Sequence, residues 1–453
     1  MWTVGWCGIF EFWNTVSVFD DMALIHLPVD HHADTLSVRI SDALLGEVVR
    51  PMPVQPAADP EAEIRDALEK PIGTPPVEQI VRSGQRVAVI VDDITRETPT
   101  RLMLPPILER LEAAGIPRGD IRVVIALGTH RPMTEEEVLV KVGPAVVRAY
   151  EIVNVPSRDE DRFVYLGASS GGIPARVLRE VAGADVRIGL GGIIPHVDAG
   201  FSGGAKIVLP GVCSDRTVDA FHARGAAVET NLLGVFDGPM RRDLEQFVSQ
   251  RVELHFILNA VLTREGALYR CVAGHFIQAH RAGVRMAQEV YCVPVARRYP
   301  LVIANSFPAN IDLWQSSKCL WTGEKMVSDG GMLVLVTPCK EGINVHPLYP
   351  DYIGRDPDDL QKELEEGRVE DPNACGGAIP VGRMKRRIRF GLVSPGLTRA
   401  DADRMGFACY GSVEEAVDAE LGASPEPACV GVLTHCDFTI PLVQSQEGSE
   451  RQT

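Results

Sequence analysis

Residues that can do chemistry gather in four short segments of the chain. Each segment contains a histidine, lysine or arginine. Glycine, an acidic residue or a hydroxyl residue lies close to it in the sequence. Histidine exchanges protons near neutral pH, and arginine or lysine binds carboxylates. The segments therefore predict acid/base chemistry on a small anionic molecule. They are Asp93–Arg96, Gly128–Arg131, Gly191–Lys206 and Trp314–Lys318.

Three histidines are the candidates for proton transfer and metal binding. His130 follows Gly128 in its loop, where a single histidine is as often a structural hydrogen-bonding group as a catalyst. A second such loop presents His196, and this favours acid/base work. One imidazole on each face of a substrate exchanges protons from opposite sides, as inversion of a stereocentre requires. A lone histidine is more often structural. His222 is a candidate ligand for nickel, copper or zinc only because His130 and His196 are also candidates for the site.

The segment Phe201–Lys206 reads Phe-Ser-Gly-Gly-Ala-Lys. Gly203 and Gly204 allow a ligand to approach the backbone closely, and Lys206 supplies a charge. The segment is not a P-loop, because Ile207 follows the lysine where serine or threonine is required. A lysine in a glycine-rich buried loop can instead anchor a cofactor covalently.

Two cations suit a substrate carboxylate. Arg96 binds such a group through two parallel hydrogen bonds, and Lys318 adds a point charge from the second half of the chain. For any single arginine or lysine, a surface ion pair is the alternative interpretation.

The elements that position these residues follow an α/β pattern. Residues 86–91 and 121–127 are short apolar runs typical of buried parallel strands, and helical spacing follows each of them. Thr134 and Glu137 form a capping box at the start of one helix. The alternation predicts mostly parallel sheets, whose ligands bind beyond the carboxyl ends of the strands. Further strands are predicted at 151–155, 163–166, 186–190, 254–258, 301–304, 332–336, 389–393 and 429–433.

A second series of strands begins near residue 299 and predicts two α/β domains with an active-site cleft between them. The first 21 residues hold three of the five tryptophans but no basic region of a signal peptide, so Met22 is the expected start of the fold. The predicted division is an extension outside the fold at 1–21, a cofactor-binding domain at 22–298, a C-terminal domain at 299–443 and a flexible tail at 444–453.

Composition excludes several classes of protein. The net charge of −16 over 453 residues disfavours nucleic acid as a partner. No apolar run approaches the roughly 18 residues of a membrane helix, so no membrane partner is expected. The 10 cysteines contain no CxxC pair, which argues against a zinc ribbon and favours a reducing, cytoplasmic location. The oligomeric state is not predicted.

Together, the four segments and His222 resemble the nickel-pincer lactate racemase family. The resemblance extends from about residue 36 to the region of residue 393. Its most specific part is the stretch from His196 to Lys206, and the order and spacing of the other segments agree with the family.

The resemblance implies an isomerase that carries nickel in a pyridinium-derived mononucleotide with two sulfur donors. It implies that a hydride moves from the substrate's Cα to the cofactor ring and back, through a transient 2-keto acid. The implied roles are His130 and His196 as the acid/base pair, Lys206 as covalent anchor, His222 as nickel ligand, Gly203, Gly204 and Asp93 beside the cofactor, and Arg96, Gln315 and Lys318 on the substrate.

Three departures from the family pattern concern the substrate. Glu97 stands where proline is usual, Trp314 replaces the tyrosine before the glutamine, and no tryptophan follows Trp321. These changes argue against lactate itself. They favour a larger or more polar 2-hydroxy acid, or a sugar acid epimerised at one centre.

Two other functions stay open at this point. A zinc-dependent hydrolase or lyase could use the same three histidines, although their spacing matches no zinc motif and leaves Lys206 without a role. A non-catalytic protein that stores or senses the cofactor would bind it without turnover.

Overall fold

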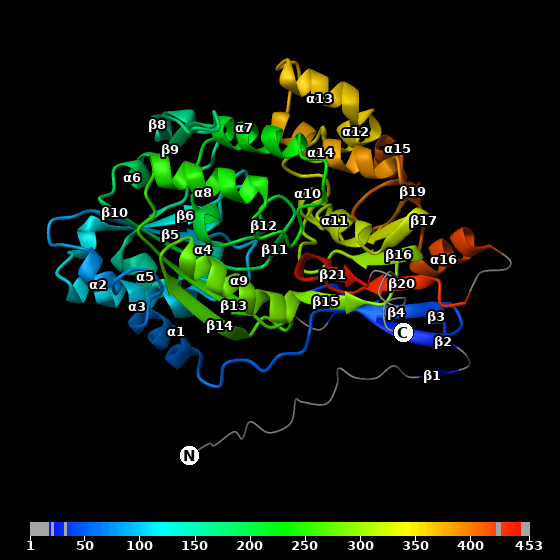
Figure 1. Cartoon of the computed structure of the whole chain (residues 1–453), viewed down its shortest axis with the longest axis horizontal. Coiled ribbons are helices and arrows are strands. Elements are labelled where there is room, and N and C mark those ends of the chain that lie inside the picture. The colour runs from blue at the N-terminus through cyan, green and yellow to red at the C-terminus, as the bar shows by residue number, and fades with distance from the viewer. Residues whose placement is uncertain (1–17, 20–21, 31–33, 423–426, 445–453) are drawn as a thin grey trace, which may run out of the picture.

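A computed structural model describes residues 18–19, 22–30, 34–422 and 427–444, and these form two α/β halves built around separate sheets (Figure 1). Most of the predicted extension at 1–21 and nearly all of the predicted tail at 444–453 lie outside the described residues. The α/β class with mostly parallel sheets is confirmed. Within the described residues, no helix is long and apolar enough to cross a membrane.

The first half contains a six-stranded sheet in the order β14-β13-β10-β5-β6-β7. All neighbours are parallel except β13 and β14. Alternate residues of β5 enter opposite cores: Val89 packs with the helices of one face, and Ile90 packs with those of the other. The strands are β5 (Val87–Asp92), β6 (Ile121–Ala126), β7 (Glu151–Val153), β10 (Val186–Gly192), β13 (Phe256–Leu262) and β14 (Leu268–Gly274).

Helices cover both faces of this sheet, as burial of a parallel sheet requires. One face carries α1 (Pro60–Glu69), α2 (Val77–Ile80), α3 (Thr100–Ala113), α4 (Glu135–Val142) and α5 (Pro144–Ala149). The other carries α6 (Arg179–Ala182), α7 (Asp215–Ala226) and α8 (Pro239–Arg251), and α9 (Gln278–Tyr291) packs at the edge formed by β13 and β14.

The second half contains a parallel sheet in the order β19-β18-β17-β16-β20-β4. Its strands are β16 (Tyr299–Asn305), β17 (Val327–Val336), β18 (Arg389–Val393), β19 (Ala408–Cys409), β20 (Val430–Leu433) and β4 (Leu45–Val49). Its helices are α10 (Leu313–Ser316), α11 (Cys319–Glu324), α12 (Tyr349–Gly354), α13 (Pro357–Glu365), α14 (Pro372–Lys385), α15 (Arg399–Met405) and α16 (Val413–Leu421).

The start of the chain does not follow the predicted division. β4 joins the second sheet beside β20, and β2 (Met22–Pro28) and β3 (Thr35–Ser41) pack with α16 on its outer face. Residues 22–49 therefore belong with the second half, because their apolar side chains share its core. β1 (Val18–Phe19) pairs with the edge of β2, so the backbone of these two residues is part of the fold rather than an extension outside it.

Three pairs of short strands lie outside the main sheets. Two of the pairs are hairpins and one is parallel. β8 (Phe163–Ala168) was predicted within the α/β alternation but pairs antiparallel with β9 (Pro174–Leu178). β11 (Pro195–His196) and β12 (Gly200–Phe201) form a hairpin directly after β10. β15 (Cys292–Val295) and β21 (Ile440–Val443) form a parallel pair where the chain passes from the first half to the second.

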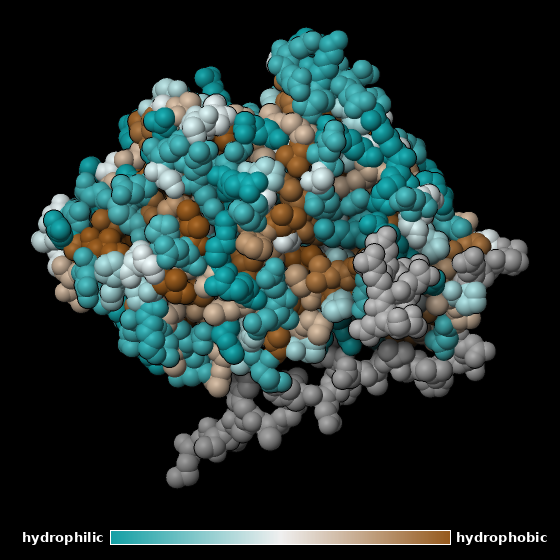
Figure 2. Space-filling view, in the orientation of Figure 1, coloured by the Kyte–Doolittle hydropathy of each residue, from teal (hydrophilic) through white to brown (hydrophobic). Residues whose placement is uncertain are grey.

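Strand order changes direction between β5 and β10 in the first sheet and between β16 and β20 in the second. The crevice outside the carboxyl ends at such a point is where open α/β sheets bind ligands. In Figure 1 the hairpin β11–β12 and the helices α10 and α11 lie between the two sheets. Figure 2 shows apolar residues gathered along the same junction.

Candidate active site between the two sheets

A cavity lies at the junction, with its wall built from the carboxyl ends of β5, β6 and β10, from α7, and from α10, α11 and α14 of the second half. Together with the open solvent at its mouth, the cavity contains about 1170 Å³ of empty space. Eight predicted residues line it: Asp93, Arg96, His130, His196, Gly203, Lys206, His222 and Lys318.

His130 is held by a buried carboxylate. Asp93 is 3% exposed, and its Oδ2 lies 2.6 Å from His130 Nδ1. Burial raises the pKa of Asp93, but the charge of His130 and its hydrogen bond, with Arg96 and Thr95, hold that pKa well below its usual range. The ionised carboxylate therefore accepts from Nδ1–H, and Nε2 of His130 keeps its lone pair.

Gln315 reaches that lone pair from the second half. Its Nε2 lies 2.8 Å from Nε2 of His130, and its Oε1 accepts a hydrogen bond from Lys318 Nζ. Asp312 caps α10 by accepting from the backbone N–H of Gln315 at 2.7 Å, which fixes the start of the helix. A chain of contacts thus runs from Asp93 through His130 and Gln315 to Lys318. Gln315 adjoins the cavity through His130 rather than through its own wall.

His196 lies in a different environment, on the hairpin β11–β12. Its Nδ1 accepts from the backbone N–H groups of Asp198 at 3.1 Å and Ala199 at 3.3 Å. Burial, followed by the charges of Lys206 and Lys318, holds the pKa of His196 well below its usual value. The ring is therefore neutral, and its single proton is on Nε2.

Lys206 lies one short 3-10 turn after Gly203 and Gly204. Both glycines have positive φ, and a Cβ on Gly203 would lie 2.8 Å from the side chain of Ile193. Gly204 does not line the cavity; its N–H donates to Asn259 Oδ1 at 2.9 Å and fixes the loop. Burial and the charge of Arg96 hold the pKa of Lys206 well below its usual value, which makes the neutral, nucleophilic form of its amine easier to reach.

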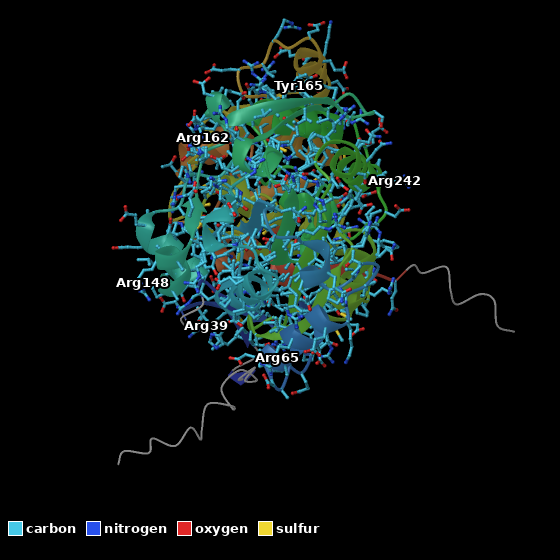
Figure 3. All side chains as sticks on the ribbon, turned by 90° about the vertical axis from the view of Figure 1, so that its left-hand side faces the viewer. Arg39, Arg65, Arg148, Arg162, Tyr165 and Arg242 are labelled. Carbon is cyan, nitrogen blue, oxygen red and sulfur yellow. The ribbon has the colours of Figure 1, made fainter. Side chains whose placement is uncertain are left out.

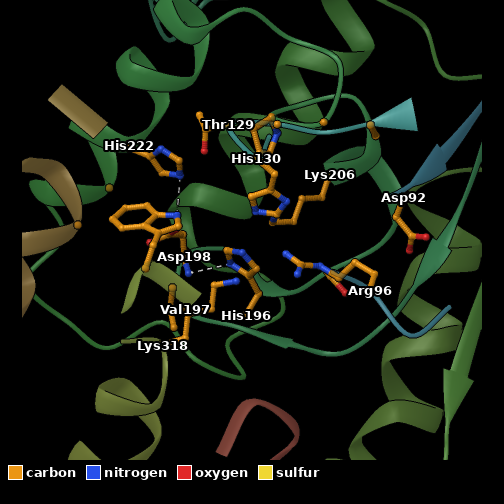
Figure 4. A pocket seen from close by; sticks show the side chains of 18 of the residues that line it. Asp92, Arg96, Thr129, His130, His196, Val197, Asp198, Lys206, His222 and Lys318 are labelled. Atoms are coloured by element: carbon orange, nitrogen blue, oxygen red, sulfur yellow. Dashed lines mark hydrogen bonds and ion pairs between the residues drawn. The ribbon is translucent and has the colours of Figure 1, made fainter. Parts of the chain in front are cut away.

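His222 projects from α7 toward the same space as Lys206 and His196 (Figure 4). Its Nε2 lies 3.8 Å from Asp198 Oδ2, and its side chain is 18% exposed. Burial lowers the pKa of His222, so its imidazole is neutral, which is the form that binds a metal.

Arg96 and Lys318 face the cavity, whereas the arginines labelled in Figure 3 lie on the outer surface. Burial and the charge of Arg96 lower the pKa of Lys318 to about 8. Together with Lys206, these cations create a local positive field in a protein of net charge −16. An anionic substrate is therefore attracted to this cavity and not to the surface in general.

Two features of the site were not predicted from the sequence. Lys141 of α4 is buried, lies 2.8 Å from Asp92 Oδ1 and donates to the carbonyl of Arg96 at 2.7 Å, which holds the Asp93–Arg96 loop in place. The adjacent acids at the end of β5 were a signal for a site, but no local pattern connects them to a helical lysine. The second feature is an aromatic wall of Trp314, Trp321 and Tyr349.

Glu97 was expected near the substrate arginine. It lines a smaller cavity on the other side of Arg96, together with Asp437 and Phe438, and is absent from the wall of the main cavity. Trp314 does line the main cavity, and its ring packs against His346 and Tyr349 at centroid distances of 4.5 and 4.9 Å. Of these two departures from the family pattern, only the tryptophan faces the main cavity.

Comparisons with known proteins agree with this geometry. The family model of the lactate racemase N-terminal domain matches residues 31–232. Lactate racemase from Thermoanaerobacterium thermosaccharolyticum is 29% identical over 319 residues, which are 68% of this chain and 73% of that protein. The lactate racemase of Lactiplantibacillus plantarum is 29% identical over 351 residues, which are 76% of this chain and 81% of that protein.

The fold matches as well. The lactate racemase apoprotein from Thermoanaerobacterium thermosaccharolyticum superposes with a TM-score of 0.81 at 25% identity, covering 93% of this chain and all of that one. The chain is thus similar to lactate racemases in sequence and in fold. This similarity identifies it as an enzyme, an isomerase of the racemase class. A protein from Thermotoga maritima shares the fold, with a TM-score of 0.67 and 19% identity over 85% of this chain and 98% of that one.

Proposed function

We propose that this chain interconverts stereoisomers of a 2-hydroxy acid with the help of a nickel-pincer nucleotide. The observation that carries the proposal is a single cavity in which two differently prepared histidines, His130 and His196, face a group of buried cations. Similarity to lactate racemases gives the class of reaction, and the cavity gives residues for each part of it.

The residues present fit such a cofactor. The Lys206 side chain is partly buried, and within the described part of the chain its amine has no hydrogen bond or ion pair. Gly203 lines the cavity and has no side chain, so its backbone can come close to a ligand. Lys206 would anchor the cofactor covalently, and His222, with its neutral ring, would bind nickel through one nitrogen. When bound, the group supplies an acceptor that takes the Cα hydride and returns it, which protein side chains cannot do.

The chain's own residues bind the acid and move its proton. Arg96 and Lys318 bind the substrate carboxylate, and Gln315 contacts a neighbouring oxygen. His130 takes the hydroxyl proton at Nε2, because Asp93 stabilises the imidazolium that forms. His196 faces the hydroxyl of the opposite stereoisomer.

The aromatic wall excludes water from this step. Trp314 and Tyr349 pack edge to face, and Trp321 is buried beside them. A dry cavity strengthens the interactions of the cations with the substrate and protects a transient 2-keto acid.

We propose that the substrate is larger or more polar than lactate, either a longer 2-hydroxy acid or a sugar acid. Support comes from Trp314, which lines the cavity where the family pattern has tyrosine, and from the polar Ser317 beside it.

A zinc hydrolase is not favoured. Across the described ranges, no group of three or more histidine, cysteine, aspartate or glutamate side chains is placed to hold a metal ion, so His130, His196 and His222 do not form a three-histidine site. A storage or sensor protein is not favoured either, because the chain is similar to enzymes and has a prepared base in Asp93–His130.

The test uses protein produced in a host that makes the cofactor. The loaded enzyme is incubated with single stereoisomers of 2-hydroxy acids and aldonates, and the products are separated by chiral chromatography. The proposal predicts inversion at C2 of at least one acid, nickel in the protein, and inversion at least about 100-fold slower in the His130→Ala variant. Inversion of none of the acids by nickel-loaded protein, or stoichiometric zinc in place of nickel, would contradict it.

A further inference from the structure

A polar cluster lies behind His222, on the side away from the main cavity's other histidines. It consists of His346, Asp371 and Asn373, which come from the loop before α12 and the start of α14. His346 and Asn373 are 7% and 2% exposed. Buried polar groups of this kind need hydrogen-bond partners, and here the partners include a residue of the first half.

α14 packs against α7 at His222. A Cβ on Gly376 would lie 3.2 Å from the carbonyl oxygen of His222, so a larger residue there would push the helices apart. Asn373 precedes Gly376 by three residues and therefore lies on the same face of α14. The small Gly376 brings this face, with the side chain of Asn373, close to His222.

The orientation of the Asn373 amide follows from its neighbours. His346 Nδ1 lies 2.7 Å from Asp371 Oδ2, so Nδ1–H donates to the carboxylate and Nε2 of His346 accepts. Asn373 Nδ2 lies 3.3 Å from that Nε2 and 3.4 Å from Thr129 Oγ1. Both long contacts engage the amide nitrogen, which leaves the oxygen free to face the other way.

That oxygen has one available partner. Asn373 Oδ1 and His222 Nδ1 are both buried, and within the described residues neither has a hydrogen-bond partner. The Asn373 side chain is within hydrogen-bonding reach of the His222 ring, where it raises the pKa of His222 against the larger lowering effect of burial. A lone acceptor and a lone donor atom are thus side by side between the two halves.

We propose that Asn373 is a positioning residue for His222: its Oδ1 accepts from Nδ1–H and so fixes the tautomer that presents the Nε2 lone pair to the cavity. The competing acceptor, Asp198 Oδ2, is 3.8 Å from Nε2, too far for a hydrogen bond. The inference rests on the proposed function for the identity of the metal that Nε2 binds. Its consequence is that the second half orients a metal ligand of the first half.

Metal retention tests the proposal in the loaded protein. Nickel loss to an excess of chelator is measured for wild type and for Asn373→Leu, which keeps the volume and removes the acceptor. Loss of an outer hydrogen bond to a metal-bound histidine weakens metal binding about 10- to 100-fold. We expect nickel loss to quicken by that factor in Asn373→Leu, with the mass of the cofactor on Lys206 unchanged.

Two further variants separate the hydrogen bond from packing. Asn373→Asp restores an acceptor and is expected to retain nickel within about threefold of wild type. Cys375→Ala alters the packing of α14 against Leu360 without touching His222 and serves as the matched control. Wild-type retention in Asn373→Leu, or equal loss in Asn373→Leu and Cys375→Ala, would overturn the inference.

A second measurement uses metal-free protein and does not depend on the cofactor. Nitrogen-15 NMR of labelled histidine distinguishes Nδ1–H from Nε2–H tautomers, and the His222→Gln variant assigns the signal. The inference predicts the Nδ1–H tautomer for His222 in wild type and its loss in Asn373→Leu; an Nε2–H tautomer in wild type would overturn it. Wild-type protein that binds no nickel would instead contradict the proposed function, while this tautomer still decides the role of Asn373.

Discussion

The two histidines that we propose as the acid/base pair, His130 and His196, have opposite hydrogen-bond environments. His130 has a carboxylate at Nδ1, so its Nε2 carries a lone pair and an extra proton would be stabilised by Asp93. His196 has two backbone N–H groups at Nδ1, so its Nε2 carries the proton in the neutral ring. At rest, one ring is a base and the other is a hydrogen-bond donor.

Charge widens this difference. His196 lies among Lys206, Lys318 and Arg96, all of which oppose a positive charge on its ring. The site therefore does not contain two equivalent bases. A stereoisomer whose hydroxyl faces His130 meets a ready acceptor, whereas one that faces His196 must first move a proton from Nε2 to Nδ1. We expect the two directions of the reaction to differ in kcat.

The largest effect is expected from Lys206→Ala, which removes both the proposed anchor and a charge beside His196. Activity should fall to background, and the mass increment of the cofactor should disappear from the intact protein. Lys206→Arg is the matched variant, since it keeps the charge but cannot form the same attachment, and it should lose the increment as well. An increment that persists in Lys206→Ala would place the anchor elsewhere.

Removal of the imidazole of His130 or of His196 tests whether proton transfer occurs on both faces of the substrate. His130→Ala and His196→Ala should each lower the rate of inversion by about 10²- to 10⁴-fold, the range of general acid–base catalysis. Nickel content should stay at the wild-type value, because His222 is untouched. His26→Ala, at an exposed histidine of β2, is the control and should be fully active. Inversion at more than a tenth of the wild-type rate in either active-site variant would contradict the assignment.

Asp93→Asn acts on the His130 side alone. The amide cannot stabilise an imidazolium and can donate to Nδ1, which places the remaining proton of His130 on Nε2. We expect kcat/KM to fall about 10²-fold, the lower end of the contribution of a general base, and to fall equally for the two stereoisomers, because each direction of inversion passes through His130. Initial rates with each stereoisomer measure this. A loss of less than about threefold would contradict the role of Asp93 in preparing His130.

The smallest effect concerns pH and the cations around His196. Lys318 has a pKa lowered to about 8, so it is charged below that pH and neutral above it. The value of kcat/KM should therefore fall about tenfold per pH unit above pH 8, mainly through KM. Lys318→Arg should remove the fall, because arginine stays protonated. If kcat/KM of Lys318→Arg also fell above pH 8, the fall would belong to the titration of another group.

Local patterns predicted the parts of the fold and site that depend on neighbours in the sequence. The capping box of Thr134 and Glu137 is present, and the strand ends carry His130 and the hairpin of His196 where expected. These features depend on turns and on apolar runs of a few residues, so a short window of sequence contains their cause.

Such local patterns do not predict which distant segments pair. β4 pairs with β20 across more than 380 positions, and the sequence of residues 45–49 does not indicate that partner. The same applies to the proposed contact of Asn373 with His222, which depends on the close packing of α14 on α7 at Gly376. Sequence reasoning predicted eight residues that line the cavity, but it did not predict the residues that we propose orient them.

The central claim is that the histidines move the hydroxyl proton and leave the Cα hydrogen to the cofactor. The direct test is to invert one stereoisomer of a 2-hydroxy acid in deuterium oxide and to measure deuterium at Cα of the product by mass spectrometry. The account predicts a product that keeps its original Cα hydrogen. Deuterium at Cα in step with inversion would show that a histidine removes the Cα proton instead, and would contradict the account.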